Sequence, residues 1–181
     1  MSIPVPRREA LAEAPAEAPG YPTSVELRAE VERLLRSRGV TLEDIADVVC
    51  AVQAPYFPDL TPTECLLSVG TVLDKREVQH AILTGIALDT LAERGLLDDP
   101  LLSIVRSDDG LYGLDEVLAL AVTNIYGSIG LTNFGYLDKE KVGIIGRLNS
   151  SKGGQVHTFL DDLVAAVAAA AAARIAHQRR P

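Results

Sequence analysis

The chain has 181 residues, 48% of them hydrophobic, which suits a single domain with a sizeable core. Aromatic residues make up 4% and Trp is absent, so the core must be built from Leu, Val, Ile and Ala, which favours helices over a β-sandwich. The formal net charge of -8 argues against a nucleic-acid-binding protein, because phosphate binding requires clustered Lys and Arg.

The first 20 residues have the composition of a disordered arm. Prolines lie there among Glu and Ala, and no continuous apolar run marks a secretory signal. Further along, the uncharged stretch 117–137 has too many Thr, Asn, Ser and Tyr side chains for a convincing membrane span. We therefore expect a disordered arm over residues 1–20, a helical domain over residues 21–181, no transmembrane segment and a cytoplasmic location.

Helix start and stop signals follow one another through the first half of the domain. The predicted helices begin at Ser24, Thr41 and Thr61 and end near Gly39, Pro55 and Gly95. The start at Thr61 is the strongest, because a capping hydroxyl is followed by Pro at the first helical position and Glu at the third. Gly70 is a candidate break within the last of these patterns.

Cys50 and Cys65 are too few and too isolated in the sequence for a disulfide framework or a zinc site. Each falls on a predicted helix among apolar neighbours. We expect both to be reduced, buried thiols.

The second half of the domain continues the helical pattern. Helices are predicted over residues 100–106 and 114–126, followed by a Gly-rich segment to Gly135 with no assigned element, and by an irregular or helical piece over residues 138–148. A polar loop from Ser150 to Gly154 precedes the last helix. No alternating strand pattern of convincing length occurs, so the fold class is all-α.

The last helix has a composition that surface helices lack. From Ala165 to Ala173 only Val167 interrupts a run of alanines, and no charged residue follows Asp162 until Arg174. Alanine is the best helix former, and its small side chain lets neighbouring helices approach from every direction. We predict a multihelical single domain with this buried alanine-rich helix at its centre and about five other helices around it.

Two pairs of acids each open an apolar helix. Asp161 and Asp162 precede the alanine run, and Asp115 and Glu116 precede an equally apolar stretch. A single such pair commonly complements the helix dipole, but two pairs that converge would form an oxygen-rich site for Mg²⁺ or Mn²⁺. Helical geometry sets Asp161 and Asp162 about 100° apart, so their side chains cannot both point the same way.

Further candidates lie between the two pairs. Asp138 is a candidate metal ligand and Lys141 a candidate phosphate-binding cation, although a charged turn of this kind is commonly just solvated. Backbone N–H groups at Gly153 and Gly154 are candidates for contact with a substrate phosphate, although such a loop is usually only flexible. His80 and His157 are candidate proton donors.

These residues also form an ordered pattern along the last third of the chain. In order, the pattern comprises Phe134, Leu137, Asp138, Lys141, Ile145, Gly153-Gly154 and Asp161-Asp162-Leu163-Val164, with Asp115-Glu116 before it. It resembles the carboxyl-terminal signature of the phosphatidylglycerophosphatase A family. From Tyr21 onward the chain is similar to the soluble, low-temperature-requirement C-like branch of that family.

The resemblance implies a multihelical fold with a central helix and Mg²⁺-dependent hydrolysis of a phosphate monoester, which in the parent family yields phosphatidylglycerol. The implied metal ligands are Asp115, Glu116, Asp138, Asp161 and Asp162. Asp162 or Glu116 would orient the attacking water, and Lys141 would bind a nonbridging phosphate oxygen. The implied partner is a phosphate monoester, including a phospholipid reached by peripheral contact with a membrane.

Two other interpretations stay open. An all-α nucleoside phosphate hydrolase also uses acidic residues on helices to hold Mg²⁺. The second alternative is a non-catalytic helical module whose exposed apolar faces form a homo-oligomer. Gly135, Val142 and Ile144 favour it, because they stand where the family signature has an arginine and two prolines.

Overall fold

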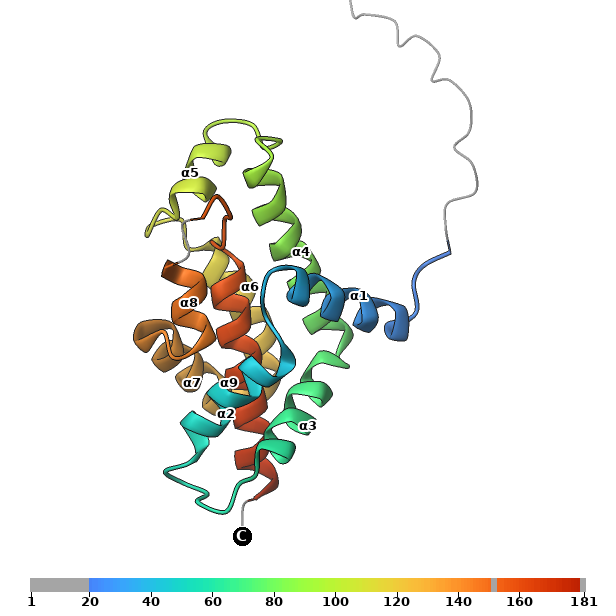
Figure 1. Ribbon diagram of the computed structural model, residues 1–181, viewed down its shortest axis with the longest axis vertical. Coiled ribbons are helices and arrows are strands. Elements are labelled where there is room, and N and C mark those ends of the chain that lie inside the picture. The colour runs from blue at the N-terminus through green and yellow to red at the C-terminus, as the bar shows by residue number, and fades with distance from the viewer. Residues whose placement is uncertain (1–19, 151–152, 180–181) are drawn as a thin grey trace, which may run out of the picture.

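The computed structural model describes residues 20–150 and 153–179, and every regular element among them is a helix (Figure 1). In chain order the elements are α1 (Ser24–Ser37), α2 (Leu42–Gln53), α3 (Pro62–Leu73), α4 (Arg76–Glu93), α5 (Leu101–Ser107), α6 (Leu114–Thr123), the short 3₁₀ helix η1 (Asn124–Tyr126), α7 (Gly127–Glu140), α8 (Ile144–Ser150) and α9 (Leu160–Gln178). The all-α prediction is confirmed. Apart from Gly20, the predicted arm lies outside the described residues, as do two residues of the predicted polar loop.

The alanine-rich helix α9 is the centre of the fold, as its composition predicts. Every residue from Leu160 to Ala173 is buried, and α2, α3, α4, α6, α7 and α8 pack around it. Small side chains on both sides permit this enclosure. On α4, a Cβ at Gly85 would overlap the side chain of Leu163, so the close approach of α4 to α9 requires glycine there.

Three helix starts use the capping chemistry that the sequence suggests. At Thr23, Thr41 and Thr61 the hydroxyl accepts a hydrogen bond from the backbone N–H three residues on, and the acid at that position bonds back to the threonine N–H. The prediction of Ser24 as the first cap is wrong by one residue. Thr23 takes the role because Glu26 stands three residues after it, whereas Ser24 is already helical.

Two element boundaries differ from the prediction because packing outweighs the helix-breaking tendency of glycine. The chain breaks between α3 and α4 at Asp74 and Lys75, and Gly70 stays inside α3. The Gly-rich segment after residue 126 is helical and forms most of α7. Its residues Gly130 and Phe134 are buried, and a glycine costs only about 1 kcal/mol within a helix.

The two cysteines are free thiols, as predicted, but only Cys65 is buried, Cys50 is partly buried, and the two are not isolated from each other. Cys50 on α2 and Cys65 on α3 place their Sγ atoms 2.6 Å apart. Burial raises the pKa of the Cys65 thiol to about 12. The turn between α2 and α3 brings them together, which their spacing in the sequence does not reveal.

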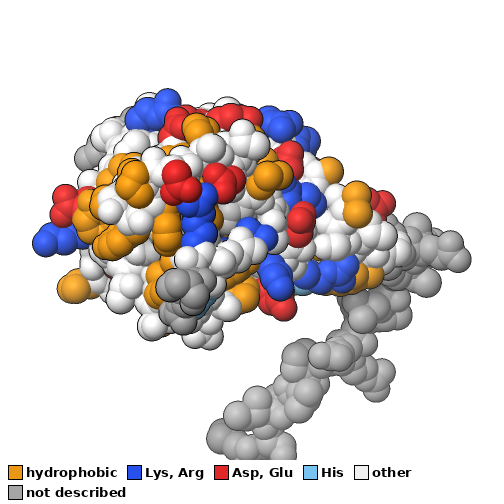
Figure 2. Space-filling view, turned by 90° about the horizontal axis from the view of Figure 1, so that it is seen from below, with side chains coloured by type: hydrophobic (Ala, Val, Ile, Leu, Met, Phe, Trp, Pro, Cys, Tyr) orange, Lys and Arg blue, Asp and Glu red, His pale blue; other side chains and the backbone are white. Residues whose placement is uncertain are grey.

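The stretch Leu114–Glu140 is the one stretch of the described chain that is long and apolar enough to cross a membrane by length and composition. It does not form one straight helix, because the chain turns at Gly127, where φ is +70°. Only 28% of its most apolar window is buried. Seen from the lower end of the molecule (Figure 2), hydrophobic side chains gather toward the left, the side on which α7 lies in Figure 1.

Candidate functional site

The ammonium group of Lys141 lies among three carboxylates beside the start of α9. Its Nζ atom is 2.8 Å from Asp138 Oδ1, 3.0 Å from Asp161 Oδ2 and 3.4 Å from Asp162 Oδ1. Asp138 and Lys141 come from the end of α7, and the other two acids come from the first turn of α9. Asp161 and Asp162 reach one ammonium despite their angular separation on the helix, because Lys141 lies between them. We call these four residues the acidic cluster.

Burial disfavours charge on the two acids of α9, whose side chains are each 6% exposed. Burial raises the pKa of Asp161, and burial together with the charge of Asp161 raises the pKa of Asp162. Although burial alone would lower the pKa of Lys141, the charge of Asp161 and the hydrogen bond to Asp138 raise it above its ordinary value. One fixed cation therefore faces more carboxylate charge than it can neutralise.

Two further carboxylates, Asp115 and Asp108, lie near the acidic cluster, and their charges raise the pKa values of Asp162 and Asp161, respectively. Asp115, at the start of α6, is 9% exposed, and its Oδ1 atom is buried without a hydrogen-bond partner among the described residues. Burial raises the pKa of Asp115, and the charges of Asp108 and Asp138 raise it further. A buried oxygen without a partner costs about 1–3 kcal/mol, so this atom is a candidate ligand for a cation.

The backbone is strained at two points of this region. Asp108 and Lys141 are the two residues other than glycine in the described chain with positive φ, at 52° and 48°. Each ends a helix in the left-handed conformation, which is uncommon for such residues and costs about 1–3 kcal/mol. The backbone conformation of Lys141 requires glycine at position 146, because a Cβ there would overlap the carbonyl oxygen of Lys141. The surrounding packing thus holds Lys141 in place.

Asp89 of α4 orients the start of α9. The Phe159 N–H donates to Asp89 Oδ1 and the Leu160 N–H donates to Asp89 Oδ2, both at 3.1 Å. These N–H groups lie at a helix start, where no carbonyl of the same helix is available to them. Sequence analysis missed Asp89, although one signal was present: it is the only charged residue between His80 and Glu93. By holding the start of α9, the Asp89 carboxyl group also positions Asp161 and Asp162 in the first turn of that helix.

The oxygen ligands of this region suit a hard divalent cation, but they are not arranged as a preformed site. In the part of the chain that the structure describes, no three His, Cys, Asp or Glu side chains are placed to hold one ion. The ammonium of Lys141 occupies the space among three of these carboxylates, with its Nζ atom 2.8–3.4 Å from one oxygen of each. The ammonium would have to move aside, and Asp115 Oδ1 would supply a further oxygen.

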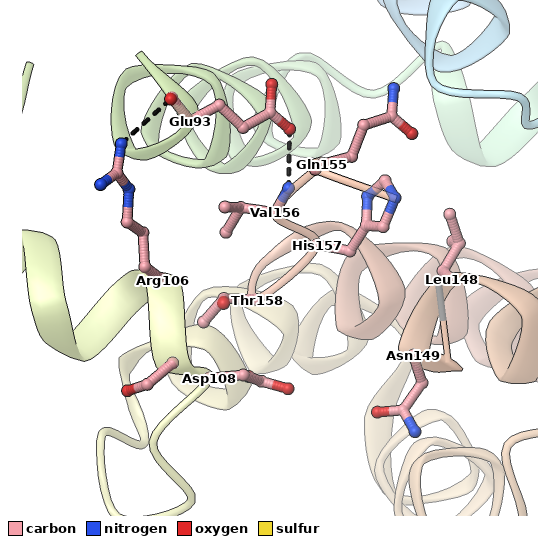
Figure 3. Close-up of a pocket in the computed structure, with 11 residues that line it drawn as sticks. Glu93, Arg106, Asp108, Leu148, Asn149, Gln155, Val156, His157 and Thr158 are labelled. Atoms are coloured by element: carbon pink, nitrogen blue, oxygen red, sulfur yellow. Dashed lines mark hydrogen bonds between the residues drawn. The ribbon is translucent and has the colours of Figure 1, made fainter. Parts of the chain in front are cut away.

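A cavity of about 760 Å³ lies beside the segment that precedes α9, and none of the four residues of the acidic cluster lines it (Figure 3). The ends of α4, α5 and α8 and the segment before α9 form its walls. Asp108 connects the two regions, because it lines the cavity and its charge raises the pKa values of Asp115 and Asp161. The other charged or amide side chains and the imidazole in its wall are Glu93, Arg106, Asn149, Gln155 and His157. The cavity is therefore a polar compartment beside the carboxylates.

A buried ion pair supports the wall of this cavity. Arg38 Nη2 lies 2.6 Å from Glu93 Oε1 and 3.3 Å from His157 Nδ1, and it also donates to the Val156 carbonyl. Since arginine can only donate, Nδ1 is the acceptor, and a neutral His157 carries its proton on Nε2. Burial and the charge of Arg38 lower the pKa of His157, which favours that neutral form.

Several predicted site residues lie outside the acidic cluster. Glu116 is exposed on α6, and none of the ion pairs among the described residues includes it. His80 is exposed on α4 and hydrogen-bonds the hydroxyl of Tyr21 at 3.2 Å. Gly153 and Gly154 are exposed, and Gly154 lines the cavity. The acids Asp161, Asp162, Asp138 and Asp115 and the cation Lys141 are the predicted residues that the fold brings together.

Comparison with known proteins shows that the whole helical unit is shared with relatives. The family model for phosphatidylglycerophosphatase A matches residues 34–177. YutG of Bacillus subtilis, described as an uncharacterized protein, is 54% identical over 155 residues, which cover 86% of this chain and 93% of YutG.

Solved structures of relatives have the same fold. The crystal structure of YpjQ from Bacillus subtilis is 54% identical, with a TM-score of 0.83, and covers 86% of this chain and 96% of its own. The low temperature requirement C protein from Listeria monocytogenes is 53% identical, with a TM-score of 0.82, and covers 84% of this chain and 96% of its own.

Proposed function

The chain belongs to the phosphatidylglycerophosphatase A family, and on that premise we propose that it hydrolyses a phosphate monoester at the acidic cluster. One observation supports this most directly: a single ammonium, Lys141, lies among Asp138, Asp161 and Asp162 where the end of α7 meets the buried start of α9, with the unpaired Oδ1 of Asp115 nearby. A divalent cation would offset this excess of carboxylate charge, and the substrate phosphate would then bind the cation and Lys141. The proposed cofactor is Mg²⁺ or Mn²⁺.

The proposed mechanism assigns a role to each part of the cluster. The metal would be held by Asp115, Asp138, Asp161 and Asp162, and when bound it supplies charge neutralisation and a more acidic water. Lys141 Nζ donates to a nonbridging phosphate oxygen. Asp162 orients the attacking water and accepts its proton, because a carboxyl group with a raised pKa is a stronger base near neutral pH.

The cavity beside the cluster is the proposed compartment for the leaving group. His157, neutral and with its proton on Nε2, is placed there as a hydrogen-bond donor to the departing oxygen rather than as a charged acid. Asp162 then returns to the leaving alkoxide the proton that it took from water. The protons balance in this scheme without a change in the charge of His157.

The proposed substrate is phosphatidylglycerophosphate, whose hydrolysis yields phosphatidylglycerol and phosphate. The protein would then be cytoplasmic and would reach the lipid by peripheral contact with the membrane. The net charge of -8 opposes adhesion to an anionic surface, so we expect such contact to be transient.

Phosphate release by the purified full-length chain tests the proposal. With Mg²⁺, we expect release from phosphatidylglycerophosphate in detergent micelles or from a soluble phosphomonoester. Asp162→Asn should lower the rate at least ~100-fold, since it removes the proposed base. Asp47→Asn, at an exposed acid of α2, is the matched control and should keep the activity of the native protein.

Two results would overturn the proposal. The first is inactivity on both substrate classes together with a thermal stability that Mg²⁺ and Mn²⁺ leave unchanged. The second is pyrophosphate release from a nucleotide panel, which would identify a nucleoside phosphate hydrolase instead. Equal losses in the Asp162 and Asp47 variants would remove Asp162 from the mechanism.

A further inference from the structure

The outward surface of α6 and α7 carries large apolar side chains that the rest of the described chain leaves exposed. Its large hydrophobic side chains, which we call the α6–α7 face, are Leu114, Val117, Leu120, Ile125, Leu131 and Tyr136, and each is exposed by 38% or more. The opposite sides of the two helices supply buried residues that pack on α9. Single exposed leucines are ordinary, but six such side chains on two adjacent helices and the short turn between them form a patch that calls for a partner.

The α6–α7 face is also free of charge. No ionisable acid or base other than a tyrosine occurs between Glu116 and Asp138, although the chain as a whole has a net charge of -8. Two copies of this protein therefore repel one another over much of their surface, and this repulsion is weakest where the two α6–α7 faces meet. Hydrophobic burial and the charge distribution favour the same contact.

We propose that a second copy of this chain covers the α6–α7 face, and that the protein is a homodimer through it. Asn124, Ser128 and Thr132 are exposed on the same helices and are polar but uncharged. In a two-fold interface each polar group can face its counterpart or a neighbouring backbone group of the partner and form hydrogen bonds. The Thr132 hydroxyl already donates to the Ser128 carbonyl within α7, but a hydrocarbon environment would offer no partner to the side chains of Asn124 and Ser128.

A lipid surface is the competing occupant, and the observations favour it less. Membrane-binding faces are usually bordered by an excess of Lys and Arg, whereas this one is bordered along the chain by Asp115-Glu116 at one end and by the charge-balanced run Asp138-Lys139-Glu140-Lys141 at the other. Asp138 belongs to the acidic cluster, so this border of the face lies next to the proposed phosphate site. A homodimer would leave the helix ends that carry these acids at the rim of the interface, where solvent and substrate still reach them. The dimer does not depend on the proposed hydrolysis.

The molecular mass in solution tests the homodimer. Sedimentation equilibrium of the full-length chain should give twice the chain mass of 19.3 kDa at micromolar concentration. Leu131→Glu should raise the dissociation constant at least ~10-fold, or about 1.4 kcal/mol, because symmetry places the new charge on both sides. Val117→Asp should do the same from α6.

The matched control is Leu67→Glu, at a leucine of α3 that is 66% exposed and lies outside the α6–α7 face. It should leave the dimer intact, and circular dichroism should show all three variants as helical as the native chain. A native chain that is monomeric at all concentrations, or a dimer that Leu67→Glu dissociates and Leu131→Glu does not, would overturn the proposal. So would a monomer that binds vesicles of phosphatidylglycerol and phosphatidylcholine and loses binding with Leu131→Glu.

Discussion

Replacing Asp89 by alanine should weaken the whole domain and disturb the acidic cluster at the same time. The change removes both oxygens that accept hydrogen bonds from the N–H groups of Phe159 and Leu160. Asp89 is 0% exposed, so no water replaces those oxygens without rearrangement. The start of α9 would lose its orientation, and Asp161 and Asp162 would move with it.

The expected loss of unfolding free energy follows from the two N–H groups, of Phe159 and Leu160, that would have no acceptor. A buried N–H group without a partner costs about 1–3 kcal/mol, so two of them set a range of about 2–6 kcal/mol. Burial raises the pKa of Asp89 to about 8, against the opposing effect of the two hydrogen bonds. The carboxyl group is then partly neutral near pH 7 and accepts less strongly. We therefore expect about 2–4 kcal/mol from Asp89→Ala, and about half of that from Asp89→Asn, which keeps one acceptor oxygen.

Denaturant unfolding measures this prediction directly. The free energy of unfolding of Asp89→Ala is compared with that of the native chain and of Asp47→Ala, a matched control at an exposed carboxylate. The control should stay within about 0.5 kcal/mol of the native value. If Asp89→Ala lost no more than the control does, then Asp89 would not hold the start of α9, and the reasoning would be refuted.

Three further predictions concern the same region. Asp162→Asn should stabilise the protein by about 1 kcal/mol at about pH 8, because burial raises the pKa of Asp162 above its value in the unfolded chain. The stability that the neutral carboxyl group supplies to the native protein is lost as pH rises through the folded pKa. The stability advantage of the Asn variant over the native protein should therefore shrink as pH falls toward about pH 4. Arg38→Met should cost about 3 kcal/mol in denaturant unfolding, because it leaves Glu93 partly buried without its cation. Gly85→Ala should cost about 1–3 kcal/mol in the same assay, because the new Cβ overlaps Leu163.

Each of these has an outcome that would contradict it. A thermal midpoint of Asp162→Asn that is lower than the native one at about pH 8 would show that its charge is stabilising. An Arg38→Met variant with native stability would mean that Glu93 is solvated. Gly135→Ala is the control for Gly85→Ala, because nothing lies within 4 Å of a Cβ at Gly135, and equal losses in both would remove the packing argument.

Much of the fold follows from local patterns that extend over three or four residues. The capping boxes at Thr41 and Thr61 were predictable because each depends on neighbours within one helical turn, and the burial of the alanine helix was predictable from its lack of charged side chains. The helical state of the segment after Gly127 was not, since its glycines oppose helix formation locally. Packing against α9 decides that segment, and this packing depends on residues far away in the chain.

The candidate site divides in the same way. Acids that open apolar helices drew attention to Asp161 and Asp162, and the resemblance to the family signature added weight to Asp138 and Lys141, whose charged turn is by itself commonly just solvated. Only the tertiary structure decided which of them meet. It placed Lys141 within 3.0 Å of a residue 20 positions away and left the equally acidic Glu116 exposed on the outside of α6.

The residues that support the site were decided by tertiary structure alone. Asp89 serves a helix that begins 71 positions later, and Arg38 reaches the ring of His157 across 119 positions. No local rule connects such residues, because the distance between them is set by how helices pack and not by how they are spaced along the chain. Local patterns along the chain predict most of the helices and the chemical groups that they carry, whereas the packing around α9 determines which groups share a site, because hydrogen bonds and ion pairs require contact within about 3–4 Å.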